Sequence, residues 1–206
     1  MLDRTIPFCN TIMKCADYRP RRVELPEGFR IVSCRDGYAG GWGELEYAAG
    51  DFASAAEAER YFAETYLRDP ARFPDILFAL DKENRAAGSC IAWQDLRGGT
   101  PVSSLHWLVV DERCQRIGLG RALATAVMNI FAERGALPVY LHTQPWSWKA
   151  ILLYVSLGFR LQQTDTFSHY ENEYGRAMTA LRNVLPAERY DLLLRASEDG
   201  TDAGPR

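Results

Sequence analysis

The stretch Leu105–Arg121 constrains the fold of this chain most strongly, because it combines a strand pattern, a glycine loop and a helix start. Its first part is a short apolar run with β-branched and aromatic residues, which favours a buried strand. Gly118 and Gly120 then permit backbone angles and close approaches that a Cβ would block. Apolar residues continue at helical spacing as far as Phe131. A strand–loop–helix unit of this kind directs N–H groups and the positive end of a helix dipole at one point, which predicts an anion site, most naturally for phosphate.

The spacing of the loop residues excludes two familiar phosphate-binding motifs. A P-loop requires Gly-x-x-x-x-Gly-Lys-Ser/Thr, and the chain contains no such run. The dinucleotide fingerprint requires a third glycine where this chain has Leu123. The pattern that does fit is Gln/Arg-x-x-Gly-x-Gly, met by Gln115, Gly118 and Gly120. Positive charge beside the loop suits a diphosphate, and three arginines supply it: Arg113, Arg116 and Arg121. The alternative is a plain glycine turn with solvated arginines.

A second pattern lies at Ser147–Phe159. Ser147 is a good helix N-cap residue and Gly158 is a good helix stop. The residues between them are nearly all apolar, which predicts a short and largely buried helix.

With both patterns in place, the chain resembles the GCN5-related N-acetyltransferases (GNAT family). The family pattern Asn-x-x-Ala-x-x-x-Tyr-x-x-x-Gly-Phe is matched at Ala150, Tyr154, Gly158 and Phe159, with Ser147 where asparagine is usual. The resemblance covers roughly residues 28–163 and implies an α/β fold (an α+β mixed sheet). In that fold a central mixed sheet of about six to seven strands is flanked by helices, and its central parallel strands splay apart.

The resemblance also implies acetyl-CoA as the cofactor. The end of the central strand would bind the pantetheine through its backbone, and the glycine loop would bind the diphosphate. The cofactor-binding residues implied in this way are Leu108, Val109, Val110, Gln115, Arg116, Ile117, Gly118, Leu119, Gly120, Arg121, Ser147 and Tyr154. No metal is expected.

Two residues are candidates for catalysis. Tyr154 matches the tyrosine that many family members use as general acid toward the CoA sulfur; otherwise it is a core aromatic residue. His106 lies on the central strand, where some relatives that acetylate arylalkylamines have a histidine that helps to remove the amine proton. Strand alternation predicts that it shares a face with Ser104 and Leu108. Many relatives have a glutamate as the base at the position of Ser104, so in this chain His106 or a water relay must remove the amine proton instead. The alternative interpretation is that His106 is a buried histidine whose hydrogen bonds have no catalytic role.

Other polar and aromatic residues are weaker candidates. His142 ends the neighbouring strand. Glu44, Glu46 and Tyr47 lie in a segment that shapes the acceptor pocket in the family, although a solvated helix face is the favoured interpretation. Tryptophans at the entry of the Tyr154 helix are expected to serve packing: Trp146 and Trp148.

Composition limits the function classes. The 206 residues carry a net charge of −3 without a Lys/Arg block, which argues against nucleic acid as a partner. Five cysteines without a Cys-x-x-Cys are expected to be reduced, as in a cytoplasmic protein. The first residues lack the apolar region of a signal peptide, and no run is long enough to span a membrane.

The order of patterns predicts three parts: an irregular N-terminal extension at 1–27, an acetyltransferase domain at 28–195 and a disordered tail at 196–206. Strands before the glycine loop are expected to be antiparallel and those after it parallel. The expected strands are 29–34, 76–80, 86–93, 102–110, 138–143, 159–163 and 190–194. The expected helices are 40–49 (or a loop), 54–68, 119–134, 148–157 and 173–185.

The sequence therefore favours an acetyl-CoA-dependent N-acetyltransferase that acts on the amine of a small molecule by direct attack on the thioester. Two alternatives are a catalytically silent acyl-CoA-binding or sensor protein and a protein or peptide N-acetyltransferase. The resemblance also allows a homodimer.

Overall fold

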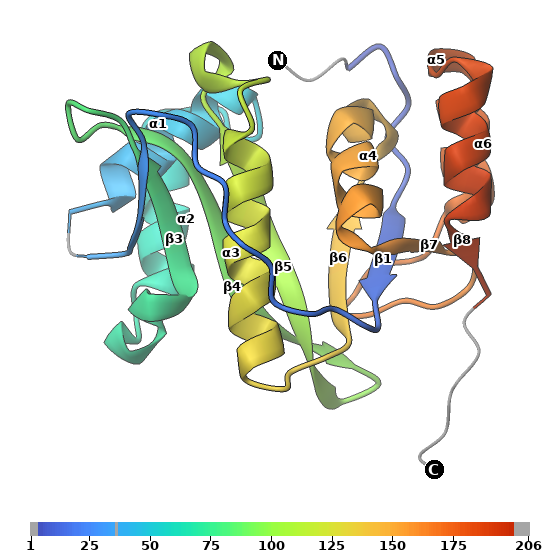
Figure 1. Ribbon diagram of the computed structural model, residues 1–206, viewed down its shortest axis with the longest axis horizontal. Coiled ribbons are helices and arrows are strands. Elements are labelled where there is room, and N and C mark those ends of the chain that lie inside the picture. Colours follow the sequence, from blue (N-terminus) through green and yellow to red (C-terminus); the bar gives the residue numbers. More distant parts are fainter. Residues whose placement is uncertain (1–3, 36, 200–206) are drawn as a thin grey trace. The chain divides into compact units, whose positions relative to one another are not determined.

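The computed structural model describes residues 4–35 and 37–199 (Figure 1). Among these residues, hydrogen bonds join eight strands in the order β2-β3-β4-β5-β6-β1-β7-β8. The strands are β1 (Thr11–Cys15), β2 (Arg30–Ser33), β3 (Ile76–Leu80), β4 (Ala86–Arg97), β5 (Thr100–Val110), β6 (Val139–Thr143), β7 (Arg160–Gln162) and β8 (Ser197–Glu198). The helices are α1 (Ala39–Ala49), α2 (Ala55–Tyr66), α3 (Leu119–Glu133), α4 (Trp148–Leu157), α5 (Tyr174–Val184) and α6 (Ala187–Arg195). Short 3₁₀ turns are η1 (Pro70–Asp75), η2 (Glu112–Cys114) and η3 (Pro145–Ser147). The expected mixed α/β class is confirmed, with more strands than the six to seven expected.

The chain forms two compact units. One contains residues 19–93 and 105–135, and the other contains the remaining described residues. β4 and β5 each pass from one unit into the other along the chain.

In the first unit, helices cover both faces of the strands (Figure 1). β2 pairs antiparallel with β3, and β3 pairs antiparallel with β4. One face packs against α1 and α2 through a buried cluster of large side chains: Trp42, Ala58, Phe62, Tyr66, Ile76, Phe78, Leu80 and Ile91. The opposite face meets α3, where a Cβ on Gly88 would lie 3.0 Å from a methyl of Leu123. Each fully buried large side chain contributes about 1.5–3 kcal/mol to folding.

α2 begins as its sequence predicts. The hydroxyl of Ser54 accepts a hydrogen bond from the amide of Glu57, 3.1 Å away. The Glu57 carboxylate in turn accepts a bond from the amide of Ala53, at 3.3 Å. Two donors at the helix start are therefore satisfied, as in a capping box.

The second unit corrects two predictions, the irregular N-terminal segment and the parallel pairing of the strands after the glycine loop. β1 lies within the segment expected to be irregular, and it pairs antiparallel with both β6 and β7. β6 and β7 are consequently not neighbours. The parallel pairs are β5 with β6, where Ser104 lies opposite Tyr140, and β7 with β8. Four of the five residues of β1 are buried, so this strand belongs to the interior of its unit.

The end of the chain also differs from the prediction. The segment Tyr190–Leu194, expected as a strand, lies within helix α6. Ser197 and Glu198, expected in a disordered tail, form β8 and pair with β7. Residues 200–206 of that expected tail lie outside the described residues.

Candidate functional site

The glycine loop follows β5 within the first unit and is held by local hydrogen bonds. Asp111 accepts from the amide of Arg113 and begins η2. The side-chain amide of Gln115 then turns back and donates to the carbonyl oxygen of Val110 at 3.0 Å. Arg116 and Gly118 both have positive φ, 65° and 99°, which reverses the chain direction into α3. A Cβ on Gly118 would meet no atom within 4 Å, so this glycine is required by its backbone angle and leaves open space in front of the loop.

The start of α3 has the properties of an anion site. Gly118 is its N-cap and supplies no side-chain cap, and the first turn contains no acidic residue. The amide of Ala122 is the one that bonds to the Gly118 carbonyl, at 3.0 Å, so the amides before it point out of the helix end. The loop is exposed, and Ile117 is 49% exposed. The helix dipole therefore faces solvent, and the first turn of α3 supplies no carboxylate to neutralise it.

The loop carries less positive charge than the sequence predicts. The guanidinium of Arg113 binds the carboxylate of Asp111 through two nitrogens, at 3.0 and 2.6 Å. The hydrogen bonds from Arg113 lower the pKa of Asp111 despite its partial burial, so the pair is ionised and internally neutral. The other two arginines of the loop are Arg116 and Arg121.

His106 belongs to a partly buried hydrogen-bonded group that the sequence analysis did not identify. Its Nδ1 lies 3.0 Å from the hydroxyl of Tyr66, at the end of α2. The same hydroxyl accepts a hydrogen bond from Nε1 of Trp107, at 2.8 Å. Tyr66 is 2% exposed. The signal in the sequence is a phenol on the buried stripe of α2, because a buried phenol requires a polar partner.

Strict alternation along β5 fails at this point. Adjacent residues of a regular strand face opposite sides, yet His106 and Trp107 both reach the hydroxyl of Tyr66. The cause is a φ of +48° at Trp107, a conformation that bulky residues rarely adopt. The prediction that His106 shares a face with Ser104 and Leu108 assumed regular alternation, and the backbone at Trp107 breaks that alternation.

Tyr154 lies in the second unit, on α4. It is 6% exposed, and its ring packs edge-on against Phe159 at 5.8 Å. Gly158 ends the helix in a left-handed conformation, as predicted. Ser147 is the N-cap by position, but its side chain makes no capping bond and instead accepts from the Gln144 amide at 3.2 Å.

The weaker candidates have specific environments. His142 bonds to Asn10 at 2.9 Å and stacks on Tyr170 at 3.9 Å. A solvated helix face was expected for Glu44, Glu46 and Tyr47. Glu44 and Tyr47 are indeed exposed, but Glu46 is buried, with 1% of its surface exposed. Burial, aided by the nearby charge of Asp51, raises the pKa of Glu46 well above its ordinary value.

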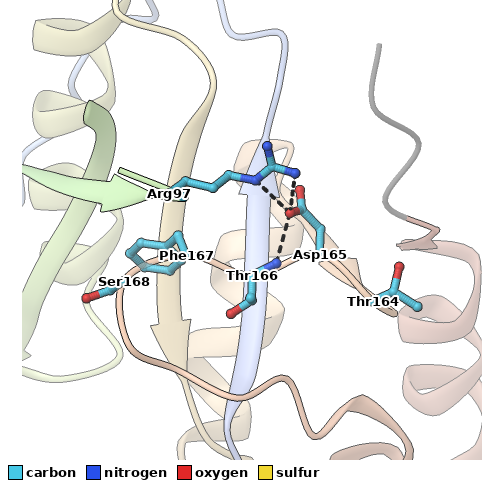
Figure 2. A pocket seen from close by; sticks show the side chains of 7 residues that line it. Arg97, Thr164, Asp165, Thr166, Phe167 and Ser168 are labelled. Atoms are coloured by element: carbon cyan, nitrogen blue, oxygen red, sulfur yellow. Dashed lines mark hydrogen bonds and ion pairs between the residues drawn. The ribbon is translucent and has the colours of Figure 1, made fainter. Parts of the chain in front are cut away.

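The second unit also contains a cavity of about 400 Å³. Figure 2 shows that its central carboxylate, Asp165, is already engaged by the guanidinium of Arg97 and the amide of Thr166. Lys14 and Tyr140 bind the same carboxylate at 3.1 and 2.9 Å. Because these four groups bind Asp165, we interpret the carboxylate as a structural group of the second unit. The lining residues are Arg97, Gly98, Thr164, Asp165, Thr166, Phe167 and Ser168.

Across residues 4–35 and 37–199, no group of three or more His, Cys, Asp or Glu side chains is placed to hold a metal ion. None of the helices in the same residues is both long and apolar enough to cross a membrane. All five cysteines are free thiols.

Comparison with known proteins identifies the family of the chain and agrees with its fold. The profile of the Acetyltransferase (GNAT) family matches residues 41–159. A mycothiol acetyltransferase of Amycolatopsis mediterranei is 34% identical over 79 residues, which is 38% of this chain and 24% of that protein. One from Acidothermus cellulolyticus is 38% identical over 68 residues, covering 33% and 21% of the two chains. The chain thus spans about a quarter of the length of these curated relatives.

Solved structures show the same fold. A GCN5-related N-acetyltransferase from Sphaerobacter thermophilus matches with a TM-score of 0.57 and 20% identity, over 75% of this chain and 48% of that one. The ribosomal-protein-S18-alanine N-acetyltransferase of Escherichia coli matches with a TM-score of 0.51 and 25% identity, over 63% and 76%.

Proposed function

Because this chain belongs to the acetyltransferase (GNAT) family, we propose that it transfers an acetyl group from acetyl-CoA to the amine of a small molecule. The curated relatives named mycothiol acetyltransferases favour a small-molecule acceptor. The similar Escherichia coli enzyme is named for a protein acceptor, so acetylation of a protein or peptide is the alternative to test.

The observation that carries the proposal is the uncapped helix end after Gly118. A diphosphate fits there because the first amides of α3 point out of the helix and the first turn contains no carboxylate. The residues that would hold the diphosphate are Gln115–Arg121, with Arg116 and Arg121 as counter-charges. Leu108–Val110 would hold the pantetheine through their backbone. Ser147 and Tyr154 complete the proposed set.

Bound acetyl-CoA supplies an activated acetyl thioester. The chain's own groups then orient the reactants and handle protons and charge. A backbone N–H near Leu108–Val110 polarises the carbonyl. Tyr154 gives its hydroxyl proton to the leaving sulfur, a role suited to a phenol that is neutral at pH 7. The proton lost by the amine goes to His106 or, alternatively, to a water relay.

The test is a two-part measurement on the full chain. First, acetyl-CoA at millimolar concentration should raise the melting temperature by binding the folded state. Second, the release of free thiol should be followed with a panel of small amines and a panel of peptides. Release with small amines supports the proposal. Release with peptides alone supports the protein-directed alternative, and a raised melting temperature without any release supports a silent acyl-CoA binder. No change in melting temperature overturns the proposal.

The chain is proposed to act in the cytoplasm, without nucleic acid or membrane as a partner. Its net charge of −3 and its five cysteines without a disulfide bond support this. A homodimer is compatible with the family.

A further inference from the structure

Glu46 is a buried carboxyl group, and one of its oxygens has no hydrogen-bond partner. Only 1% of the residue is exposed, and Oε1 meets no donor within the part of the chain that the structure describes. Burial and the negative charge of Asp51 both raise the pKa of the group, so Glu46 keeps its proton more readily than a glutamate in water. A buried acid without a partner lowers stability, and groups of this kind are concentrated at sites that bind or react.

A second polar atom without a partner lies one turn earlier on the same helix. Trp42 and Glu46 are four residues apart on α1, which places them on one face. Trp42 is fully buried, and its Nε1–H donates to no acceptor among residues 4–35 and 37–199. The interior face of α1 thus presents one donor and one carboxyl oxygen that the described chain leaves unpaired.

This face of α1 lies next to the part of β5 that carries His106. The ring of Trp42 is 5.4 Å from the ring of Trp107, the residue that follows His106. Phe52 and Tyr61 join the two tryptophans, and all six distances between the four ring centroids lie between 5.4 and 6.2 Å. Tyr61 is 37% exposed, and Phe52 is partly buried on the connection between α1 and α2. The aromatic group therefore extends from the interior face of α1 to the surface of the unit.

Aromatic rings and a carboxyl group together suit one class of ligand, an organic ammonium ion with an apolar body. The faces of aromatic rings attract cations, and a carboxylate forms its strongest hydrogen bonds with charged donors. The charge of Asp51 is close enough to raise the pKa of Glu46, and the same charge favours a cation at this place.

We propose that Glu46 binds the ammonium group of the acceptor amine, whose apolar part takes the place of the Phe52 ring beside Trp42, Tyr61 and Trp107. The inference rests on the proposed acetyl transfer and names the class of acceptor. When the amine binds, the Glu46 carboxylic acid gives its proton to water, and the carboxylate pairs with the ammonium group. No covalent bond of the acceptor forms or breaks in this step, and each buried charge compensates the other.

Two probes of similar shape separate charge from packing: 2-phenylethylamine, which is a cation at pH 7, and 2-phenylethanol, which is neutral. Calorimetric titration of the full chain should show that the amine binds at least about tenfold more tightly than the alcohol. Glu46→Gln should weaken amine binding by about 10- to 100-fold, the effect of a charged hydrogen bond, and leave the alcohol unaffected. Equal behaviour of the two probes in the wild type, absent binding included, overturns the proposal. An unchanged amine affinity in Glu46→Gln does so as well.

Proton release is a readout that a merely structural Glu46 would not change. The free chain holds a proton on Glu46 that the complex has lost, so the affinity for the amine should rise with pH until the free group ionises. Titrations from pH 5 to pH 8 in two buffers of different ionisation enthalpy measure the protons exchanged. The wild type should release up to one proton per amine bound, and Glu46→Gln should release none. If the wild type releases no proton at any of these pH values, Glu46 is not the group that binds the cation.

Phe52→Ala tests the displacement of the Phe52 ring. The variant should bind 2-phenylethylamine more tightly than the wild type, because the probe no longer has to move that ring. Equal or weaker binding would show that the apolar part of the amine lies elsewhere.

Glu64→Gln is the matched control, because it removes the same charge from an exposed position on α2. It should keep both the amine affinity and the proton release; a loss equal to that of Glu46→Gln would mean that net charge alone attracts the amine. The melting temperature of each variant shows whether it is folded. If the bound amine is not acetylated when acetyl-CoA is added, the proposed function fails and the amine site remains. If amines are acetylated while Glu46→Gln binds them normally, the function remains and this inference fails.

Discussion

The side-chain amide of Gln115 donates a hydrogen bond to the backbone carbonyl of Val110, 3.0 Å away, and so ties the glycine loop to the end of β5. Gln115 is exposed, which means that this bond shapes the loop more than it stabilises the unit. This hydrogen bond joins the two segments that we propose bind acetyl-CoA, the end of β5 and the glycine loop.

Gln115→Leu should weaken acetyl-CoA binding about 5- to 10-fold, which corresponds to about 1 kcal/mol for one lost hydrogen bond. The free energy of unfolding should change by less than about 0.5 kcal/mol, because the residue is on the surface. Calorimetric titration with acetyl-CoA measures the first quantity and urea unfolding the second. Gln94→Leu, an exposed glutamine on β4, serves as the control and should bind normally.

Gly118→Val should abolish the rise in melting temperature caused by acetyl-CoA. Valine strains the backbone at φ 99° and places carbon in the open space in front of the loop. Backbone strain alone costs about 1–3 kcal/mol, so the matched control is Gly135→Val, which also places valine at a positive φ, 62°, in open space at the other end of α3. The control should lose stability but keep the cofactor response. If acetyl-CoA raised the melting temperature of both variants equally, the loop would not be part of the cofactor site.

Tyr154→Phe should lower kcat by about 10²- to 10⁴-fold, the range expected for loss of a general acid, and leave the affinity for acetyl-CoA within about twofold. Phenylalanine keeps the edge-on packing with Phe159, so the fold should survive. The checks are kcat with the best amine and a calorimetric Kd. Unchanged turnover would assign Tyr154 to packing alone.

The local parts of this fold were predictable because their signals are local. The Ser54 cap of α2, the left-handed Gly158 after α4 and the glycine loop before α3 all follow from a few adjacent residues. β1 was missed because its five residues stand alone in a proline-containing segment, and its partner β6 lies more than 120 residues further along the chain. Such a strand is defined by its neighbours in the sheet and not by a pattern of its own.

The remaining errors, at the end of the chain and at the site, also reflect the lack of a local signal. Tyr190–Leu194 is too short for periodicity to separate a strand from a helix turn, and Pro186 at the start of α6 favours the helix. The contact of His106 with Tyr66 depends on a backbone angle at Trp107 that no residue pattern announces. Glu46 was misjudged because α1 buries a glutamate, which seldom happens without a paired charge.

Glu46→Gln should stabilise the chain at neutral and alkaline pH. Burial and the charge of Asp51 raise the pKa of Glu46 in the folded state, so the folded chain holds a proton that the unfolded chain releases. Wild-type stability should therefore fall as pH rises above about 4.5, the ordinary glutamate value, until the folded group ionises. Glutamine removes this dependence. Urea unfolding from pH 4 to pH 9 should show that the free energy of unfolding of the variant exceeds that of the wild type by an increasing amount as pH rises. Glu44→Gln, exposed on the same helix, should follow the wild type.

Asp165→Asn should destabilise the second unit by about 3 kcal/mol at pH 7, because it leaves Lys14 and Arg97 without the carboxylate that binds them. Burial alone would raise the pKa of Asp165, but hydrogen bonds from Lys14, Tyr140 and Arg97 outweigh it and hold the pKa below its ordinary value. The folded carboxylate thus releases its proton more readily than the unfolded one, and its contribution to stability is present above about pH 4 and lost as pH falls through the lowered pKa. Urea unfolding from pH 7 to pH 2.5 should show the gap between wild type and variant closing in acid. Asp191→Asn, on the exposed side of α6, should show no gap at any pH; a constant gap for Asp165→Asn would mean that packing, and not charge, explains its effect.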